Sequence, residues 1–307
     1  MMRKAGLNLV LAGAIASSGC SHGRHTVADA VSASQPAAAT QPAANVKNAS
    51  PQVGDPFVGF DRNDYPGDDT MASMRKVFSF TGYWLTNPPG ENANTWAGKR
   101  TLLHSQGWGF LVLANGKLDA EILKAKKSGT SPAALGKSDA AIAVAAAKRE
   151  GFPAQTILFL DQEEGGRLLD EQAEYFLAWT EAVAGSNYRP GVYASGQRVQ
   201  DDPGVWIDTI EDIRARVKKA GLHEVAIFNA LDQCPPSPGC TRHAKPLSTA
   251  PDLNLTAWQY SQSPRRPEIT QSCGATYAAD GNCYAPGFPQ VFLDMDAADS
   301  ADPSHGR

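Results

Sequence analysis

Short hydrophobic runs recur along the chain from Pro56 onward, and polar or helical stretches separate them. Apolar runs of this length, bounded by Gly, Pro, Asn or Ser, are typical of buried β-strands. The pattern predicts eight strands, at residues 57–61, 79–85, 109–115, 156–163, 190–196, 224–230, 255–261 and 290–296.

Helical patterns lie between most of these strands. One is expected to begin with Ser138 as its N-cap, a second starts at Asp170, and a third ends at Gly221. Eight strands that alternate with helices, several of them apolar on both faces, indicate an α/β fold with a TIM-like (β/α)8 barrel. The last crossovers are Pro-rich and irregular, so a doubly wound open sheet is the alternative.

The first twenty residues have the layout of an export signal, with a basic start and an apolar stretch too short to span a bilayer. The letters "ASSGC" look like a bacterial lipoprotein cleavage site, which makes Cys20 the expected lipidated residue. Ser17 departs from the aliphatic residue that is usual there, and ordinary cleavage after Ala16 is the alternative. We expect an exported, membrane-anchored lipoprotein of the bacterial cell envelope, periplasmic or on the outer surface.

The remaining chain divides by composition. Residues 21–53 are rich in Ala, Ser, Gln and Pro without apolar periodicity, which predicts a flexible tether. Residues 54–300 carry the barrel pattern, and residues 301–307 are assigned to a tail.

The chain has five cysteines. Two local disulfide loops are expected in an oxidising compartment, Cys234 with Cys240 and Cys273 with Cys283. Cys20 is left over, which favours the lipoprotein interpretation. Free buried thiols are the alternative for the four others.

The overall composition is ordinary for a soluble globular protein, with 42% hydrophobic and 20% charged residues. A net charge of -4 argues against a nucleic-acid partner. No spacing of His and Cys suggests a metal site. These features leave an enzyme or a binding protein of the cell envelope as the main classes.

Polar and aromatic side chains gather near the predicted strand ends, where the chemistry of such barrels is found. Carboxylates suit proton transfer, rings stack on sugar faces, and amides bind hydroxyl groups. The candidate residues are Asp61, Tyr83, Trp84, Asn115, Asp161, Glu163, Tyr193, Asn229, Gln259, Tyr260, Asp294 and Asp296. Trp96 and Trp108 could line a glycan groove, although buried tryptophans are the commoner case.

Asp161 and Glu163 form the most specific pair. Because they are two residues apart on a strand, their side chains point to the same face, with about 6.5 Å between their Cβ atoms, whereas Glu164 faces the other way. Two close carboxyl groups tend to keep one proton, as a general acid requires. The alternative is that these acids only neutralise the N-terminus of the following helix.

Five motifs in register extend this picture, and together they resemble a known family. "GFDRND", "DQEEG", "GVYAS", "AWQYS" and "LDMD" are similar to motifs of the glycoside hydrolase family 25 lysozymes and, more closely, of the Rv2525c-like glycoside-hydrolase-like domain (domain of unknown function 1906). The resemblance covers about residues 53–298. It implies cleavage of peptidoglycan or a related polysaccharide without a cofactor, with Glu163 as general acid and Asp161 assisting.

The resemblance also implies that Asp61 and Asp294 line the site and that Tyr193 and Tyr260 are rim aromatics. We expect Gln259, Trp84, Asn229 and Asp296 to contribute to substrate binding as well. A non-catalytic glycan-binding or envelope-organising lipoprotein on the same barrel is the alternative. A peptidoglycan amidase or peptidase is disfavoured, because neither a zinc cluster nor a nucleophilic cysteine is evident.

Overall fold

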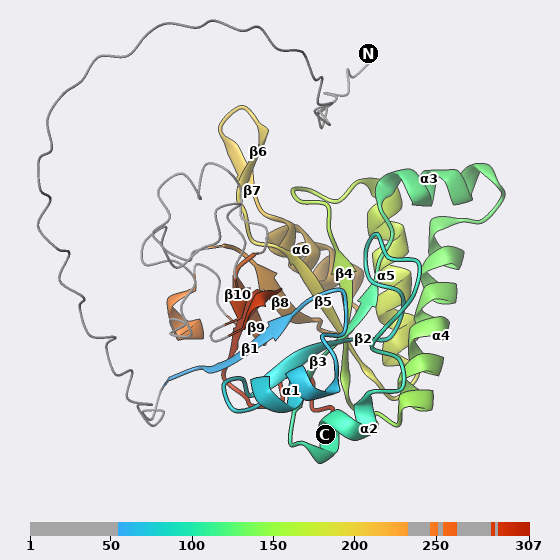
Figure 1. Ribbon diagram of the computed structural model, residues 1–307. Coiled ribbons are helices and arrows are strands. Elements are labelled where there is room, and N and C mark those ends of the chain that lie inside the picture. Colours follow the sequence, from blue (N-terminus) through green and yellow to red (C-terminus); the bar gives the residue numbers. More distant parts are fainter. Residues whose placement is uncertain (1–54, 233–245, 251–253, 263–283, 286–287) are drawn as a thin grey trace, which may run out of the picture. The chain divides into compact units, whose positions relative to one another are not determined.

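Eight strands close into a barrel with helices packed against it in the computed structural model (Figure 1). The structure describes residues 55–232, 246–250, 254–262, 284–285 and 288–307. The strand order around the barrel is β1-β12-β9-β8-β5-β4-β3-β2. The barrel prediction is therefore confirmed, and the open-sheet alternative is wrong.

The barrel strands are β1 (Phe57–Asp61), β2 (Phe80–Trp84), β3 (Gly109–Asn115), β4 (Ile157–Gln162), β5 (Arg189–Ser195), β8 (Ala226–Ala230), β9 (Ala257–Ser261) and β12 (Asp294–Ala298). The helices are α1 (Asp68–Met74), α2 (Arg100–Ser105), α3 (Asp119–Lys127), α4 (Pro132–Glu150), α5 (Asp170–Ala184), α6 (Thr209–Ala220) and a 3₁₀ turn at Leu247–Thr249. Two small sheets pair β6 (Val199–Asp202) with β7 (Val205–Ile207) and β10 (Tyr284–Ala285) with β11 (Phe288–Phe292).

Central strands of the barrel are buried on both faces, which explains their continuous apolar sequence. All six residues of β4 are buried, and so are all five of β2. Strands β1 to β5, β8 and β9 run parallel to their neighbours in this group, so their carboxyl ends meet at one rim. The rim therefore collects side chains that are far apart in the sequence.

The eighth barrel strand runs in the opposite direction from the others. Strand β12 is antiparallel to both β1 and β9, and Asp294 pairs with Asp61 in the register. The stretch 290–296, predicted as one strand, is divided between β11 and β12. Asp294 thus reaches the rim because it begins its strand, whereas the sequence pattern places it near a strand's end.

The long helix α4 begins earlier than its sequence pattern predicts. Ser131 is the N-cap and accepts a hydrogen bond from the backbone N–H of Ala134 at 3.2 Å, with Pro132 as the first helical residue. Ser138 lies inside the helix, so its prediction as the N-cap is wrong. Pro at the first helical position is favourable because its missing N–H would have no partner there. Helices α4 and α5 pack side by side against the barrel (Figure 1).

The C-terminal residues pack under the barrel between β3 and β4. Ser304 is buried, accepts a hydrogen bond from the Val112 backbone N–H through its Oγ atom at 2.9 Å, and accepts another from Ile157 N–H through its carbonyl at 2.8 Å. Asp302 accepts a hydrogen bond from Phe110 N–H at 3.0 Å. Residues 301–307, assigned to a tail from sequence, are thus part of the barrel packing.

Within the ranges that the structure describes, no helix combines the length and apolar character needed to cross a bilayer. The predicted signal segment, the tether and all five cysteines lie outside the described residues. The lipidation of Cys20 and the two disulfide loops therefore stay predictions.

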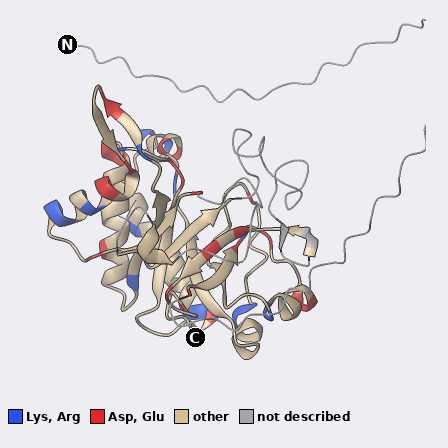
Figure 2. Cartoon of the chain, turned by 90° about the vertical axis from the view of Figure 1, so that its left-hand side faces the viewer, with Lys and Arg blue, Asp and Glu red and all other residues tan. Residues whose placement is uncertain are grey.

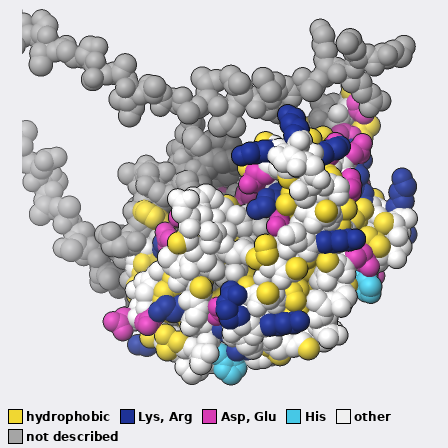
Figure 3. Space-filling view, turned by 90° about the vertical axis from the view of Figure 1, so that its right-hand side faces the viewer, with side chains coloured by type: hydrophobic (Ala, Val, Ile, Leu, Met, Phe, Trp, Pro, Cys, Tyr) yellow, Lys and Arg dark blue, Asp and Glu magenta, His cyan; other side chains and the backbone are white. Residues whose placement is uncertain are grey.

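Charged residues are distributed differently inside the barrel and on its helical face. Asp and Glu positions occur on strands in the middle of the fold (Figure 2). On the face drawn in Figure 3, Lys and Arg side chains are spread among apolar and uncharged atoms. The acidic groups of the barrel strands therefore need an explanation of their own.

Candidate functional site

The four predicted acids, which come from three separate regions of the chain, line one cavity at the carboxyl-end rim. Asp61, Asp161, Glu163 and Asp294 share a cavity of about 300 Å³. Its other lining residues are Arg62, Asn63, Asp64, Trp84, Pro89, Leu113, Tyr193, Phe228, Gln259, Phe292 and Leu293. A volume of this size is at the small end of ligand pockets and suits a sugar-sized group.

The carboxyl groups of Asp161 and Glu163 lie close enough for each to shift the pKa of the other. Asp161 is buried, and burial raises its pKa well above the usual value, with further upward contributions from Glu163 and Asp61. Burial within the walls of the cavity also raises the pKa of Glu163, although solvent reaches its side chain. Two carboxyl groups this close cannot both ionise easily, so the pair retains a proton.

Asp61 stands at the end of a chain of hydrogen bonds across the cavity. The Tyr193 hydroxyl donates to Oε1 of Gln259 at 2.8 Å, and Nε2 of Gln259 donates to Oδ2 of Asp61 at 2.9 Å and of Asp294 at 3.4 Å. Burial raises the pKa of Asp61 to about 6, against the opposing hydrogen bond from Gln259. Gln259 therefore joins β9 to the acids of β1 and β12.

A glycine on the neighbouring strand makes room for Asp61. A Cβ atom on Gly82 would lie 2.6 Å from the Cβ of Asp61, which is closer than real Cβ contacts occur. Any larger residue at this position would displace the Asp61 side chain. The sequence "TGYW" of β2 thus serves the site on β1.

A second cavity shares the acid pair with the first. It measures about 420 Å³ and shares Pro89, Asp161 and Glu163 with the first cavity. Its remaining lining residues are Gly90, Asn115, Gly116, Lys117, Leu118 and Glu121. Asp161 and Glu163 are thus lining residues of both cavities.

Three of the predicted binding residues do not line either cavity. Tyr260 lies on the opposite face of β9 from Gln259, with its ring edge-on to Trp258 at 6.1 Å. Asn229 is buried beside Gly196, whereas the preceding Phe228 lines the cavity. Asp296 is fully buried and contacts Asp61 from within the barrel. The alternation of side chains along a strand explains the positions of Tyr260 and Asn229.

Of the three tryptophans considered for a glycan groove, one lines the cavity and two do not. Trp84 forms part of the cavity wall, is 4% exposed, and donates from Nε1 to the carbonyl of Arg62 at 3.1 Å. Trp96 and Trp108 are fully buried in the core. Only Trp84 among these three is placed to contact a ligand.

Several cavity residues were not predicted from the sequence, although they are direct neighbours of predicted residues in the chain. Arg62, Asn63 and Asp64 come after Asp61 within the motif "GFDRND", and Phe292 and Leu293 precede Asp294. The signal available was adjacency, because loops that leave strand ends at the rim also line the space above it.

The third acid of the loop after β4 has a structural task. Glu164 accepts hydrogen bonds from the backbone N–H of Asp119 at 2.7 Å and from the side chain of Gln172. It therefore stabilises the start of α3 and ties it to α5. The expectation that acids here neutralise a helix N-terminus fits Glu164, while Asp161 and Glu163 face the cavities.

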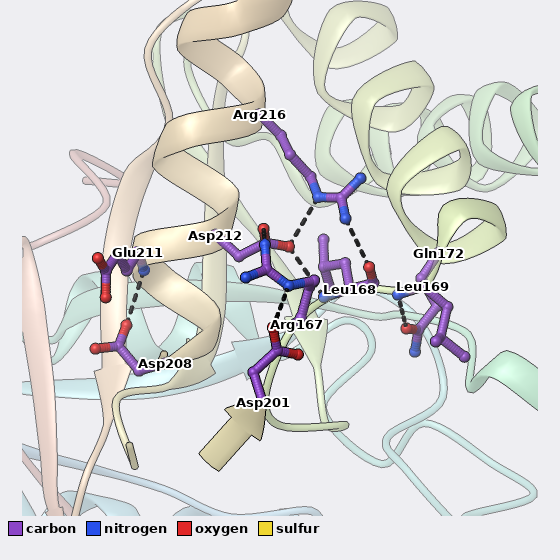
Figure 4. A network of polar contacts seen from close by, with 9 residues as sticks. All are labelled: Arg167, Leu168, Leu169, Gln172, Asp201, Asp208, Glu211, Asp212 and Arg216. Carbon is purple, nitrogen blue, oxygen red and sulfur yellow. Dashed lines mark hydrogen bonds and ion pairs between the residues drawn. The ribbon is translucent and has the colours of Figure 1, made fainter. Parts of the chain in front are cut away.

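An ion-pair network holds the other end of the same loop (Figure 4). Asp212 on α6 accepts hydrogen bonds from Nη1 of Arg167 at 3.2 Å, from Nε of Arg216 at 2.7 Å, and from the backbone N–H of Leu168 at 3.0 Å. Arg167 also binds Asp201 of the β6–β7 hairpin at 2.9 Å. Glu163 therefore lies in a segment that is anchored on both sides.

Replacing Asp212 by Asn should destabilise the protein by about 2–3 kcal/mol, because its side chain is 4% exposed and serves three charged or backbone donors. The expected fall in melting temperature is about 5–10 °C in a thermal unfolding scan. Asp201→Asn is the matched control, because it removes a single pair with a half-exposed arginine and should cost less than about 1 kcal/mol. Equal shifts in the two variants would contradict this assignment.

No group of three or more His, Cys, Asp or Glu side chains in the described part of the chain could hold a metal ion. The described cavity residues thus offer carboxyl groups, one guanidinium, amides and aromatic rings. This set can transfer protons, bind hydroxyl groups and contact a sugar ring.

Comparison with known proteins adds a family and several distant structures. Residues 80–233, half of the chain, match the family described as Rv2525c-like, glycoside hydrolase-like domain. This region includes Asp161 and Glu163. No curated protein matches the chain.

Three solved structures are similar over most of their length. An uncharacterized protein of B. stearothermophilus has 19% identity and a TM-score of 0.47, covering 79% of this chain and 96% of that one. The Tat-secreted protein Rv2525c of Mycobacterium tuberculosis, solved with L-tartrate, has 13% identity and a TM-score of 0.46, covering 80% and 95%. The catalytic domain of endolysin ply40, from bacteriophage P40 of Listeria monocytogenes, has 13% identity and a TM-score of 0.41, covering 82% and 98%.

Proposed function

Because this chain belongs to the family of Rv2525c-like, glycoside hydrolase-like domains, we propose that it is a glycosidase acting on cell-wall peptidoglycan or a related polysaccharide. The observation that carries the proposal is that Asp161 and Glu163 line both cavities. A polysaccharide bound across both spaces would have its sugars beside these acids. The bond between those sugars would then lie within reach of the proton that the pair retains.

In this mechanism Glu163 is the general acid. Its side chain is the more exposed of the two, so it can approach the oxygen of the bond to be cleaved. Its pKa is raised by burial, which keeps it protonated to a higher pH than an ordinary glutamate. The proton passes from Glu163 to the leaving oxygen as the bond to the sugar carbon breaks.

Asp161 assists instead of facing Glu163 across the sugar. In glycosidases whose two carboxyl groups flank the bond, those groups come from opposite sides of the sugar, whereas Asp161 and Glu163 are two residues apart in the chain and shift each other's pKa. Asp161 is therefore suited to orient Glu163 and to bind the substrate's acetamido group in a substrate-assisted reaction. Asp61, Asp64 and Asp294 are the carboxyl groups available elsewhere in the cavity.

The cellular location belongs to the same proposal. The basic and apolar start of the chain, together with Cys20, supports export and a lipid anchor in the bacterial cell envelope. The residues after Cys20 would serve as the tether that holds the barrel near the wall. The pairing expected for the other four cysteines would require an oxidising compartment.

The test is digestion of purified sacculi and a panel of polysaccharides by the full-length chain and by residues 54–307, with released products identified by mass. The expected result is release of glycan fragments cut at one type of linkage. Saturable binding to sacculi without any released product would overturn the glycosidase proposal in favour of a glycan-binding lipoprotein on the same barrel.

A further inference from the structure

The first cavity contains one positively charged side chain among its described lining residues, Arg62. It follows Asp61 directly, at the point where β1 ends. Its carbonyl accepts the hydrogen bond from Nε1 of Trp84, which fixes the backbone at the cavity wall. A cation held here, among five carboxyl groups, would ordinarily be expected to pair with one of them.

Arg62 makes no such pair within the described part of the chain. No carboxylate of the described residues forms a salt bridge with its guanidinium, and Nε is buried without a hydrogen-bond partner among those residues. Among the described residues, its side chain donates one long hydrogen bond, from Nη1 to the carbonyl oxygen of Phe292 at 3.4 Å. A guanidinium has five N–H donors in a planar fork, so most of this capacity is uncommitted.

The charge of Arg62 persists in this setting. Burial lowers its pKa, the nearby Asp64 opposes that effect, and an arginine starts far above neutral pH. A partly buried, charged fork with spare donors is the arrangement that binds carboxylates in two parallel hydrogen bonds. An acid-lined cavity would otherwise repel an anionic ligand, so a cation at its wall is informative about the substrate.

We propose that Arg62 binds a carboxylate carried by the substrate sugar, so that the site selects acidic sugars over neutral ones. This inference rests on the proposed function for its ligand class. The carboxylate could belong to a lactyl ether on the ring, as in muramic acid, or to C6 of a uronic acid, and the two sources share the same recognition by the guanidinium fork. Arg62 is then a specificity-determining residue of the first cavity.

The test compares each acidic oligosaccharide with the same compound after its carboxylates have been reduced to alcohols. Full-length protein carrying Glu163→Gln is used throughout to prevent turnover, and affinity is measured by calorimetry for muramic acid and uronic acid oligosaccharides. The protein with Arg62 should bind at least one acidic form about 10- to 100-fold more tightly than its reduced form. The compound that shows the preference identifies the source of the carboxylate.

Arg62→Gln should abolish the preference, and Arg62→Lys should retain part of it because a point charge remains. Arg198→Gln, on the exposed β6–β7 hairpin, is the matched control and should preserve it. Equal binding of acidic and reduced forms, no binding of either, or equal weakening of both by Arg62→Gln would overturn the proposal. If Arg62→Gln does not fold, the acidic-to-reduced comparison in the Arg62 protein still decides. Selective binding without digestion of sacculi would sink the glycosidase proposal and leave this one standing.

Discussion

Replacing Glu163 by Gln is expected to lower the rate of product release from sacculi by about 10²- to 10⁴-fold, the range that a positioned general acid contributes. Gln keeps the size of the side chain and its place beside Asp161 but has no proton to give to the leaving oxygen. The measurement is the initial rate of fragment release, with far-UV circular dichroism and a melting curve to show that the fold is kept.

Glu171→Gln is the matched control for this variant. Glu171 lies in the first turn of α5, close in sequence to Glu163, and pairs with Lys126 at the surface. Its replacement should leave the rate within about twofold, since surface pairs contribute little. A Glu163→Gln protein that digests sacculi at the wild-type rate would remove Glu163 from the mechanism.

The largest effect on stability is expected from Asp296→Asn. Asp296 is fully buried and lies next to the carboxyl group of Asp61. Burial raises its pKa well above the usual value, and the negative charges of Asp61 and Asp294 raise it further. Its contribution to stability is thus fully present below about pH 4 and is lost as the pH rises through the folded-state pKa.

Asn has no proton to lose, so it should stabilise the protein at pH 8 by about 2–4 kcal/mol and change little at pH 4. The corresponding rise in melting temperature at pH 8 is about 5–10 °C. The measurement is the difference in melting temperature between variant and wild type at each pH from 4 to 8. The contributions of the other carboxyl groups are the same in both proteins and cancel in this difference. Asp299→Asn, exposed and three residues further on, should show no such trend. A variant that melts lower than wild type at pH 8 would contradict the assignment.

Much of the barrel could be predicted because its strands are buried on both faces. Strand β3 has the bounds that its apolar run predicts, and β4 differs by one residue at each end. The direction of β12 could not be predicted, because hydrophobic pattern carries no information on strand orientation. The start of α4 was missed for a local reason: both Ser131 and Ser138 suit an N-cap, and only Ser131 is followed by Pro at the first helical position.

The acids of the site were predictable from local spacing and from their motifs. Asp161 and Glu163 lie two residues apart after a buried strand, so their shared face follows from strand geometry. Arg62 was overlooked, since a charged residue after a strand is commonplace and only the folded barrel places it in the same cavity as Asp294. The separation of Gln259 from Tyr260, one lining the cavity and the other behind it, depends on which face of β9 turns inward.

Local sequence was enough to specify most of the barrel strands, three of the helices and the spacing of the acid pair, because these depend on residues only a few positions apart. The closure of the barrel, the reversed β12 and the two cavities beside Glu163 were settled by contacts between distant segments, such as Asp61 with Asp294. Burial, and with it the raised pKa of Asp296 and Asp161, likewise exists only once those segments surround the carboxyl groups. A carboxylate that is ordinary in the unfolded chain thereby becomes a proton-holding group in the folded one.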